Sequence, residues 1–287
     1  MIILVLGAYG LLGTTLCSFL HERKYKILRQ GRSKFAHCTL NPIDKNQILN
    51  FIKTHRPNTV INLIANTNVD ECEQYPDLAF EANVKVVENL VESYREFPFH
   101  LIHISTDQLY DSKGPSIESK IKPINTYAIT KYCSEILCKQ IHSTIIRTNF
   151  VGKSKVNNKA SFSDWIYSQI IGNKKINLFH DVIFSPIDMN SLCLVIEEII
   201  NKRPVGLFNV GAENSITKKD FGLRMAYKLN IDIENRVNSI NSKELNLIAK
   251  RPKDMSMDIN LWNKASEVKL PTIDKVLEDI ILEYKQF

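Results

Sequence analysis

The chain has 287 residues, a formal net charge of +6 and a hydrophobic content of 44%. This length is enough for one large domain or one domain with a smaller lobe, and the composition is that of a soluble globular protein. The apolar segment at residues 1–6 is too short for a membrane span or a signal peptide, and no other apolar run reaches the roughly twenty residues that a membrane helix needs. We therefore expect a cytoplasmic protein that does not bind membranes.

The charges and the cysteines argue against two further kinds of site. The Lys and Arg residues are scattered and form no stripe with interleaved aromatic residues, which disfavours nucleic-acid binding and suits a small anionic ligand. The six cysteines form no Cys-x-x-Cys pair and no zinc-ligand spacing with histidine. We therefore expect reduced, packed thiols and no metal site.

The N-terminal segment predicts a dinucleotide-binding turn. Residues 2–6 have the continuous apolar pattern of a buried parallel strand, and a helix is expected at 14–22. Of the three glycines between them, the first permits a tight turn, the second lets backbone approach a pyrophosphate, and the third lets the helix pack on the strand. The cofactor-binding residues predicted here are Gly7, Tyr9, Gly10, Leu11, Leu12 and Gly13.

The segment after a second predicted strand, at 25–29, indicates which dinucleotide binds. An NAD site usually has an acidic residue here for the ribose 2′-hydroxyl. This segment instead carries Arg29 and Arg32 and has no acidic residue before Lys34. Because guanidinium groups suit a 2′-phosphate, we predict NADP, used as NADPH, with NAD as the alternative.

Further strands are expected at 58–65, 99–104 and 143–148, and helices at 44–55, 76–96 and after Pro123. This alternation predicts an α/β fold with a doubly wound parallel sheet. Ligands bind at the carboxyl ends of such strands, whereas His103, inside a strand, is expected to be a packed core residue. The cofactor candidates from these segments are Ile64, Ala65, Asn66, Asn83 and Ser105, and the substrate candidates are Thr67, Thr106 and Asp107.

A Tyr-x-x-x-Lys pair, Tyr127 and Lys131, lies just inside the helix that follows Pro123. Four residues are about one helical turn, so the phenol and the ammonium share a face. An ammonium beside a phenol favours the phenolate, so we predict that Lys131 lowers the pKa of Tyr127 toward the working range. Tyr127 can then donate a proton to a carbonyl oxygen or remove one from a hydroxyl.

The second half of the chain has a less regular pattern. Helices are expected at 161–171, 217–229 and 271–284, and short strands at 177–179 and 207–210. We therefore predict a dinucleotide-binding domain at 1–150 and a smaller, mixed α/β substrate-binding lobe at 151–287. A return of the chain to the main sheet is expected near 184–200.

The glycine turn, the segment 105–107 and the Tyr127–Lys131 pair together resemble the extended short-chain dehydrogenases/reductases. The segments 123–127, 147–150 and 251–258 are similar to those of the branch that contains the dTDP-4-dehydrorhamnose reductases, and the resemblance runs from residue 2 to about 285. It implies a Rossmann fold and NADPH-dependent reduction of a 4-keto group on a nucleotide-linked 6-deoxy-sugar, a step of dTDP-rhamnose and polysaccharide biosynthesis.

The same resemblance assigns roles to individual residues. It implies that Tyr127 is the general acid, that Lys131 holds the nicotinamide ribose, and that Thr106 orients the keto oxygen. Asn149 and Phe150 would line the sugar pocket, and Arg251 would reach the nucleotide end of the substrate, a nucleotide-diphosphate sugar.

The chain also departs from this branch. Asn66 stands where an aromatic residue is usual, and Asn41 where an Asp is usual. Related dehydratases have Glu where Gln108 follows Asp107, which disfavours dehydration, and no cysteine lies near Ser105 for combined epimerisation. A nucleotide-sugar 4-epimerase and a non-catalytic, dinucleotide-binding regulatory subunit stay open as alternatives, as does assembly into a homodimer.

Overall fold

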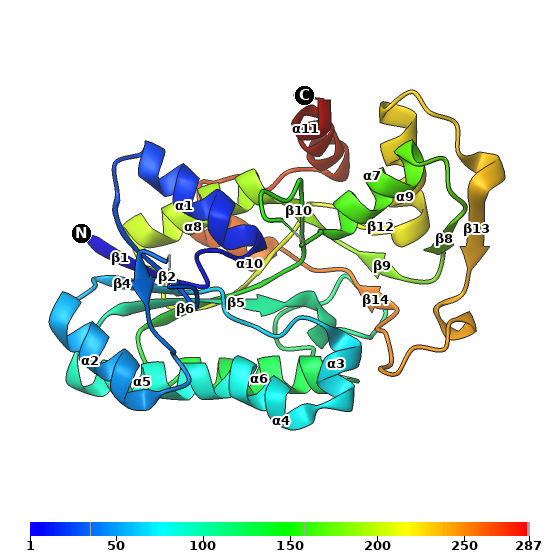
Figure 1. The fold of residues 1–287 in the computed structure, drawn as a ribbon. Helices are drawn as coiled ribbons and strands as arrows, with labels where there is room; N and C mark the ends of the chain where they lie inside the picture. Colours follow the sequence, from blue (N-terminus) through cyan, green and yellow to red (C-terminus); the bar gives the residue numbers. More distant parts are fainter. Residues whose placement is uncertain (35, 158, 286–287) are drawn as a thin grey trace.

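The computed structural model describes residues 1–34, 36–157 and 159–285. Its main body has three layers, a seven-stranded parallel sheet between two layers of helices (Figure 1). The strand order is β11-β6-β5-β4-β1-β2-β3, so the sheet grows in opposite directions from β1, and the predicted doubly wound α/β fold is confirmed. The strands are β1 (Ile2–Leu6), β2 (Lys26–Gly31), β3 (Cys38–Thr39), β4 (Thr59–Asn62), β5 (His100–Thr106), β6 (Ser143–Thr148) and β11 (Gly206–Val210).

The helices cover the sheet because its central strands are apolar on both faces. In β1, Ile3 and Val5 pack on one side and Leu4 and Leu6 on the other, as the alternation of a strand requires. The layer against Ile3 and Val5 contains α1 (Leu11–Glu22), α8 (Met189–Lys202) and α10 (Asn260–Ala265) (Figure 1). The opposite layer contains α2 (Lys45–His55), α5 (Val86–Glu96) and α6 (Thr126–Cys138) (Figure 1).

The helix predicted at 76–96 contains a change of helical geometry. It consists of α4 (Pro76–Phe80), a π-helical turn η1 (Glu81–Lys85) and α5. A π turn takes one residue more than an α-helical turn and commonly marks a functional position. Two short helices follow the strand ends of the site, α3 (Val69–Gln74) after β4 and the 3₁₀ turn η2 (Asp107–Leu109) after β5, and neither was predicted.

The smaller lobe packs beside the carboxyl ends of the strands and has its own hydrophobic cluster (Figure 1). Its helices are α7 (Phe162–Ile171), α9 (Lys218–Lys228) and α11 (Ile273–Lys285), with the 3₁₀ turns η3 (Glu234–Arg236) and η4 (Ser242–Glu244). Its short strands pair as β7 (Phe150–Val151) with β10 (Ile187–Asp188), β8 (Ile176–Phe179) with β13 (Val237–Ile240), and β9 (Ile183–Phe184) with both β12 (Ile216–Thr217) and β14 (Asp254–Met255).

A single cut near residue 150 does not separate the two parts. The hydrophobic cluster of the sheet body includes residues from Ile187 to Val210 and from Ile259 to Leu270. The chain was expected to return to the main sheet only near 184–200. The return is longer, because β11, which was expected in the lobe, pairs with β6 of the main sheet. The assignment of the two parts to cofactor and substrate stays a prediction. Among the described residues, no helix is long and apolar enough to cross a membrane.

Candidate active site

The turn between β1 and α1 is shaped to receive a phosphate group. Gly7 has a φ of +78°, and a Cβ on Gly13 would lie 2.3 Å from the carbonyl oxygen of Gly7, so both positions require glycine. A Cβ on Gly10 would meet only that same oxygen, which leaves open space in front of Gly10. Helix α1 has no side-chain cap, so the N–H groups of its first turn, which Leu11 and Leu12 begin, lack a side-chain acceptor.

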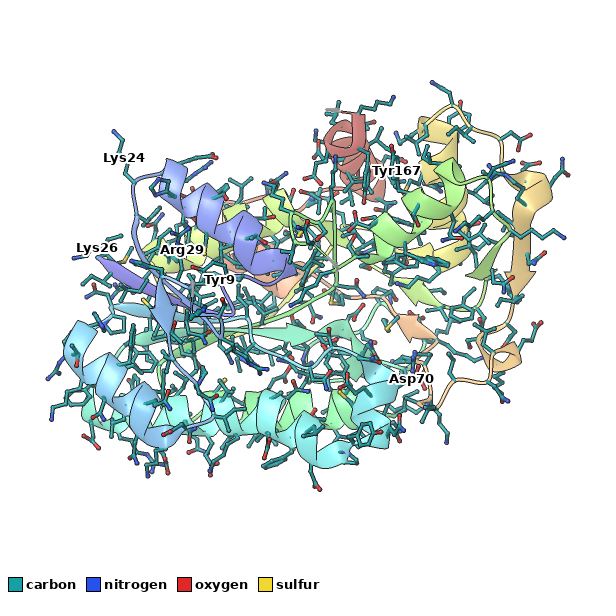
Figure 2. The ribbon with its side chains drawn as sticks, viewed as in Figure 1. Tyr9, Lys24, Lys26, Arg29, Asp70 and Tyr167 are labelled. Carbon is teal, nitrogen blue, oxygen red and sulfur yellow. The ribbon has the colours of Figure 1, made fainter. Side chains whose placement is uncertain are left out.

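Tyr9 and Arg29 lie at the same end of the sheet (Figure 2). The backbone N–H of His37 donates to the Tyr9 hydroxyl at 2.8 Å, and the N–H of Arg29 donates to Nδ1 of His37 at 3.4 Å. Buried Gln30 accepts from the N–H of Gly7 at 2.9 Å and donates to the carbonyl of Leu40 at 2.7 Å. These contacts join the glycine turn to the segment that follows β2.

That segment forms a pocket of about 430 Å³ beside Arg32. The side chains of Arg29 and Arg32 are both exposed. The pocket is lined by Arg32, Thr39, Leu40, Asn41, Ile43 and Gln47. A pocket tied to the glycine turn and bordered by a guanidinium group fits the adenosine end of NADP.

The loop after β4 carries four of the predicted residues and packs Ile64 against the glycine turn. A Cβ on Gly7 would lie 3.3 Å from Cγ1 of Ile64, so this side chain packs against the turn. Ala65 and Asn66 are partly exposed, and Thr67 is exposed.

Asn83, predicted to contact the cofactor, holds this loop from behind. It lies in the π turn and is only 1% exposed. Its Oδ1 accepts from the N–H of Asn66 at 2.8 Å, and its Nδ2 donates to the carbonyl of Asn66 at 3.3 Å and to the hydroxyl of Thr130 at 3.0 Å. Because its amide is used within the protein, Asn83 orients the loop against α6.

Tyr127 and Lys131 lie on the buried face of α6. The side chain of Asn125 accepts from the N–H of Ala128 at 2.8 Å, which starts the helix just before Tyr127. The Nζ of Lys131 donates to the carbonyl of Ile104 at 2.7 Å, which fixes the ammonium at the end of β5.

The two side chains have strongly shifted pKa values. Burial lowers the pKa of Lys131 to about 8. Burial raises the pKa of Tyr127 above its usual range, and the hydrogen bond with Thr106 opposes this shift while the charge of Asp107 adds to it. The predicted lowering by Lys131 is wrong in direction, because desolvation dominates and the ammonium binds the carbonyl of Ile104 instead. A phenol that stays protonated at neutral pH is suited to donate a proton.

Thr106 and Asp107 place two further groups beside Tyr127. The Thr106 hydroxyl accepts from the N–H of Gln108 at 3.1 Å. Asp107 is 1% exposed, and one of its carboxylate oxygens accepts from Nδ2 of Asn149 at 2.8 Å. Burial raises the pKa of Asp107 to about 6, and the hydrogen bond from Asn149 opposes the shift. Phe150, next to Asn149, is half-buried in β7.

Ser105 points away from this group of residues. Its hydroxyl donates to Oε1 of Glu135 at 2.5 Å, and it is 4% exposed. Glu135 also accepts two bonds from Arg147, at 2.8 and 2.6 Å, in an ion pair between two buried side chains. The prediction that Ser105 contacts the cofactor is therefore not supported, because its hydroxyl belongs to this network under β5.

Arg251 is held in an ion pair with Asp70 of α3. Its guanidinium donates to the two carboxylate oxygens of Asp70 at 3.1 and 2.7 Å and to the carbonyl of Ala249 at 2.9 Å. Figure 2 shows Asp70 at the end of the sheet body that meets the lobe. The positive charge of Arg251 is therefore balanced by a carboxylate of the protein itself.

Lys218 of the lobe, which the sequence analysis did not single out, also lies on the side of Asp107. It begins α9, and its Nζ lies 3.9 Å from the centre of the Phe162 ring and 3.7 Å from that of Phe184. Burial lowers the pKa of Lys218 to about 8, and the charge of Asp107 opposes the shift. In the sequence it is one of two adjacent lysines, and no pattern distinguishes it from a solvated charge.

The sequence matches the family model described as the RmlD substrate binding domain over residues 1–286. The chain belongs to this family.

Three curated relatives cover most of the chain. A probable low-salt glycan biosynthesis reductase of Haloferax volcanii is 25% identical over 94% of both chains. A dTDP-4-dehydrorhamnose reductase of Aggregatibacter actinomycetemcomitans is 25% identical over 97% of both chains. A methionine adenosyltransferase 2 subunit beta of Bos taurus is 24% identical over 80% of this chain and 72% of its own length.

Solved structures have the same fold as this RmlD family member. A dTDP-4-dehydrorhamnose reductase of Bacillus anthracis, solved in complex with NADP, superposes with a TM-score of 0.89 at 24% identity and covers 98% of this chain and 99% of its own. A hypothetical dTDP-4-dehydrorhamnose reductase of Sulfolobus tokodaii gives a TM-score of 0.85 at 28% identity, with 96% and 98% covered.

Proposed function

We propose that this member of the RmlD family is an NADPH-dependent reductase of a 4-keto group on a nucleotide-linked 6-deoxy-sugar. The observation that carries the proposal is a buried, protonated Tyr127 beside Thr106, at the strand ends that also meet the glycine turn. Reduction of a ketone requires a proton donor at the carbonyl oxygen, and a phenol with a raised pKa keeps that proton until the oxygen becomes basic.

One set of residues in the site binds the cofactor, and another binds the substrate and transfers the proton. A bound NADPH supplies the hydride. The turn at Gly10 fits its pyrophosphate, Arg29 and Arg32 fit its 2′-phosphate, and Lys131 fits its nicotinamide ribose. Binding of the ribose by the Lys131 ammonium places the dinucleotide next to Tyr127.

At the substrate, Thr106 orients the keto oxygen and Tyr127 donates the proton to it. Thr67, Asn149 and Phe150 contact the sugar. Asp107, neutralised in part by its raised pKa and fixed by Asn149, presents its carboxyl group to a sugar hydroxyl. Two relatives, a probable low-salt glycan biosynthesis reductase and a dTDP-4-dehydrorhamnose reductase, support this class of substrate.

A second candidate function is a non-catalytic, dinucleotide-binding regulatory subunit. The relationship to the beta subunit of methionine adenosyltransferase 2 favours it. Against it, Thr106, Tyr127 and Lys131 are all present and lie at one strand end, which a subunit without chemistry does not require. A cytoplasmic location and assembly into a homodimer stay predictions.

The test is to incubate the purified protein with NADPH and several nucleotide-linked 4-keto-6-deoxy-sugars. We expect loss of nicotinamide absorbance with at least one sugar and a product that is heavier by two hydrogens. An isomerised product without net use of NADPH would indicate a 4-epimerase. Binding of NADPH without conversion of any sugar would support the regulatory subunit and contradict the reductase.

A further inference from the structure

We infer that Lys218 of the lobe binds the diphosphate group of the substrate. This inference rests on the proposed function, because it names the residue that receives the charged part of a nucleotide-diphosphate sugar. It follows from the surroundings of the Lys218 ammonium and from the pairing of the other cation expected to reach the nucleotide, Arg251.

The Lys218 ammonium lies between two aromatic rings. The centres of the Phe162 and Phe184 rings are 3.9 and 3.7 Å from Nζ, and the residue is only partly exposed. Ring faces attract a cation, but they accept no conventional hydrogen bond from its three N–H groups. Within the described part of the chain, Nζ of Lys218 has no hydrogen-bond acceptor and no ion pair. This partly exposed ammonium must therefore find its acceptors in solvent or in a ligand.

The position of Lys218 relative to the strand ends suits the substrate. Its ammonium is coupled to the charge of Asp107, which lies next to Thr106 and shares a hydrogen bond with Asn149. Asp107 is one residue from the hydroxyl that orients the keto oxygen. A group held by Lys218 therefore lies on the lobe side of the strand end that carries Thr106 and Asp107.

Arg251 was expected to reach the nucleotide end of the substrate, but its charge is already compensated. Both ends of its guanidinium fork bind the Asp70 carboxylate, which is the geometry that a phosphate would otherwise occupy. Among the residues that the structure describes, Lys218 has no such partner. A diphosphate carries several anionic oxygens, so it can give Lys218 the acceptors that it lacks and can compensate its charge.

The test measures binding of diphosphates without any chemistry. The NADP-loaded protein is titrated calorimetrically with dTDP and UDP and with the matching nucleosides, thymidine and uridine. We expect the tighter nucleoside diphosphate to bind Lys218→Met about tenfold or more weakly than wild type, because a charge-assisted hydrogen bond is lost. Binding of the matching nucleoside should change little. Lys26→Met, which removes an exposed lysine at the far end of β2, is the matched control for net charge.

Lys218→Arg separates the charge from the packing. Because it keeps a cation between the rings, it should retain more affinity for the diphosphate than Lys218→Met, and thermal unfolding of both variants checks that they fold. Equal loss of affinity in both variants, unchanged affinity in Lys218→Met, or a wild type that binds neither diphosphate would overturn the inference.

The test of Lys218 and the test of the proposed reductase activity can fail independently. If the wild type reduces a keto-sugar while Lys218→Met binds the diphosphate normally, only the role of Lys218 fails. If Lys218→Met loses the diphosphate while the wild type reduces no keto-sugar, the site for the anion stands and the proposed reaction fails.

Discussion

The Nε2 of His103 lies 3.2 Å from the Nζ of Lys131, in the core between β5 and α6. The amide of Asn62 lies 3.3 Å from Nδ1 of the same ring, and the hydroxyl of Ser134 lies 3.0 Å from Nε2. Burial, followed by the charge of Lys131, holds the pKa of His103 well below its usual range. The ring is therefore neutral, and Asn62 and Ser134 fix its orientation, so His103 is a core residue that packs against the Lys131 ammonium and positions it.

Replacement of His103 by Leu should lower kcat about tenfold, because Leu cannot make the hydrogen bonds to Asn62 and Ser134 that hold the ring against Lys131, and the ammonium then loses its fixed position. Steady-state kinetics with NADPH and the reduced sugar measure the effect. His103→Gln, whose amide can replace part of these hydrogen bonds, should recover part of the loss. A Leu variant with the kcat of wild type would show that the ring only fills space.

Tyr127→Phe should lower turnover by about 10² to 10⁴, the usual worth of general acid catalysis, and leave the affinity for NADPH nearly unchanged. Tyr132→Phe, on the same helix, is the matched control and should behave as wild type. Turnover and NADPH titration are measured on both variants. If Tyr127→Phe keeps its turnover, another group donates the proton.

Arg29 and Arg32 should select NADPH over NADH. A well-formed contact with the 2′-phosphate gives a preference of about tenfold or more, which salt reduces because both side chains are exposed. Titration of both cofactors against wild type and the Arg29→Ala/Arg32→Ala variant, at two salt concentrations, measures it. Lys26→Ala, on the same strand, controls for net charge. A double variant that keeps the preference would mean that the arginines only border the site.

The buried ion pair of Glu135 and Arg147 predicts a large effect on stability. Glu135→Ala leaves the Arg147 guanidinium buried without its carboxylate, which costs about 3 to 5 kcal/mol. Urea unfolding should show this loss. The double variant Glu135→Leu/Arg147→Met removes both charges and should be more stable than Glu135→Ala. Additive effects of the two sites would contradict a direct coupling.

Asp107 predicts a dependence of stability on pH. Its pKa is raised to about 6 in the folded protein from an ordinary value of 3.8, so the folded state binds this proton more readily. Its contribution to stability therefore falls as pH rises from about 4 to about 6. Because one pKa unit is worth about 1.4 kcal/mol, Asp107→Asn should raise the free energy of unfolding by about 3 kcal/mol at pH 7 and change it little at pH 4. Urea unfolding at both values measures this, with exposed Asp77→Asn as the control.

The sequence predicted the parts of the fold that have strong local patterns. Strands that are buried on both faces are continuous apolar runs, so β1 and β6 were located within a residue of their bounds. The helix α8 was missed although it is apolar over much of its length, because its segment was interpreted only as a return of the chain.

The errors in the site come from the direction of side chains and from long-range contacts. Side chains of a strand alternate, so Ser105 points to the same face as His103, where its hydroxyl binds Glu135 in the core under β5. That period of two was available in the sequence. The approach of Lys218 to Asp107 was not, because more than a hundred residues separate them and only the packing of the lobe brings them together.

The polypeptide passes between the two hydrophobic clusters near residues 150, 185, 211, 257 and 271. A hinge that opens widely needs few connecting strands, whereas here several crossings, together with the bridge from Asp70 to Arg251, oppose a rotation of the lobe. Because of these crossings, a chain shortened to its first 150 residues would lose α8 and β11 and expose the apolar face that they cover. Neither part can then be exchanged for that of another protein on its own. A change of substrate specificity must instead arise from substitutions of single side chains, such as Lys218, while the backbone arrangement is kept.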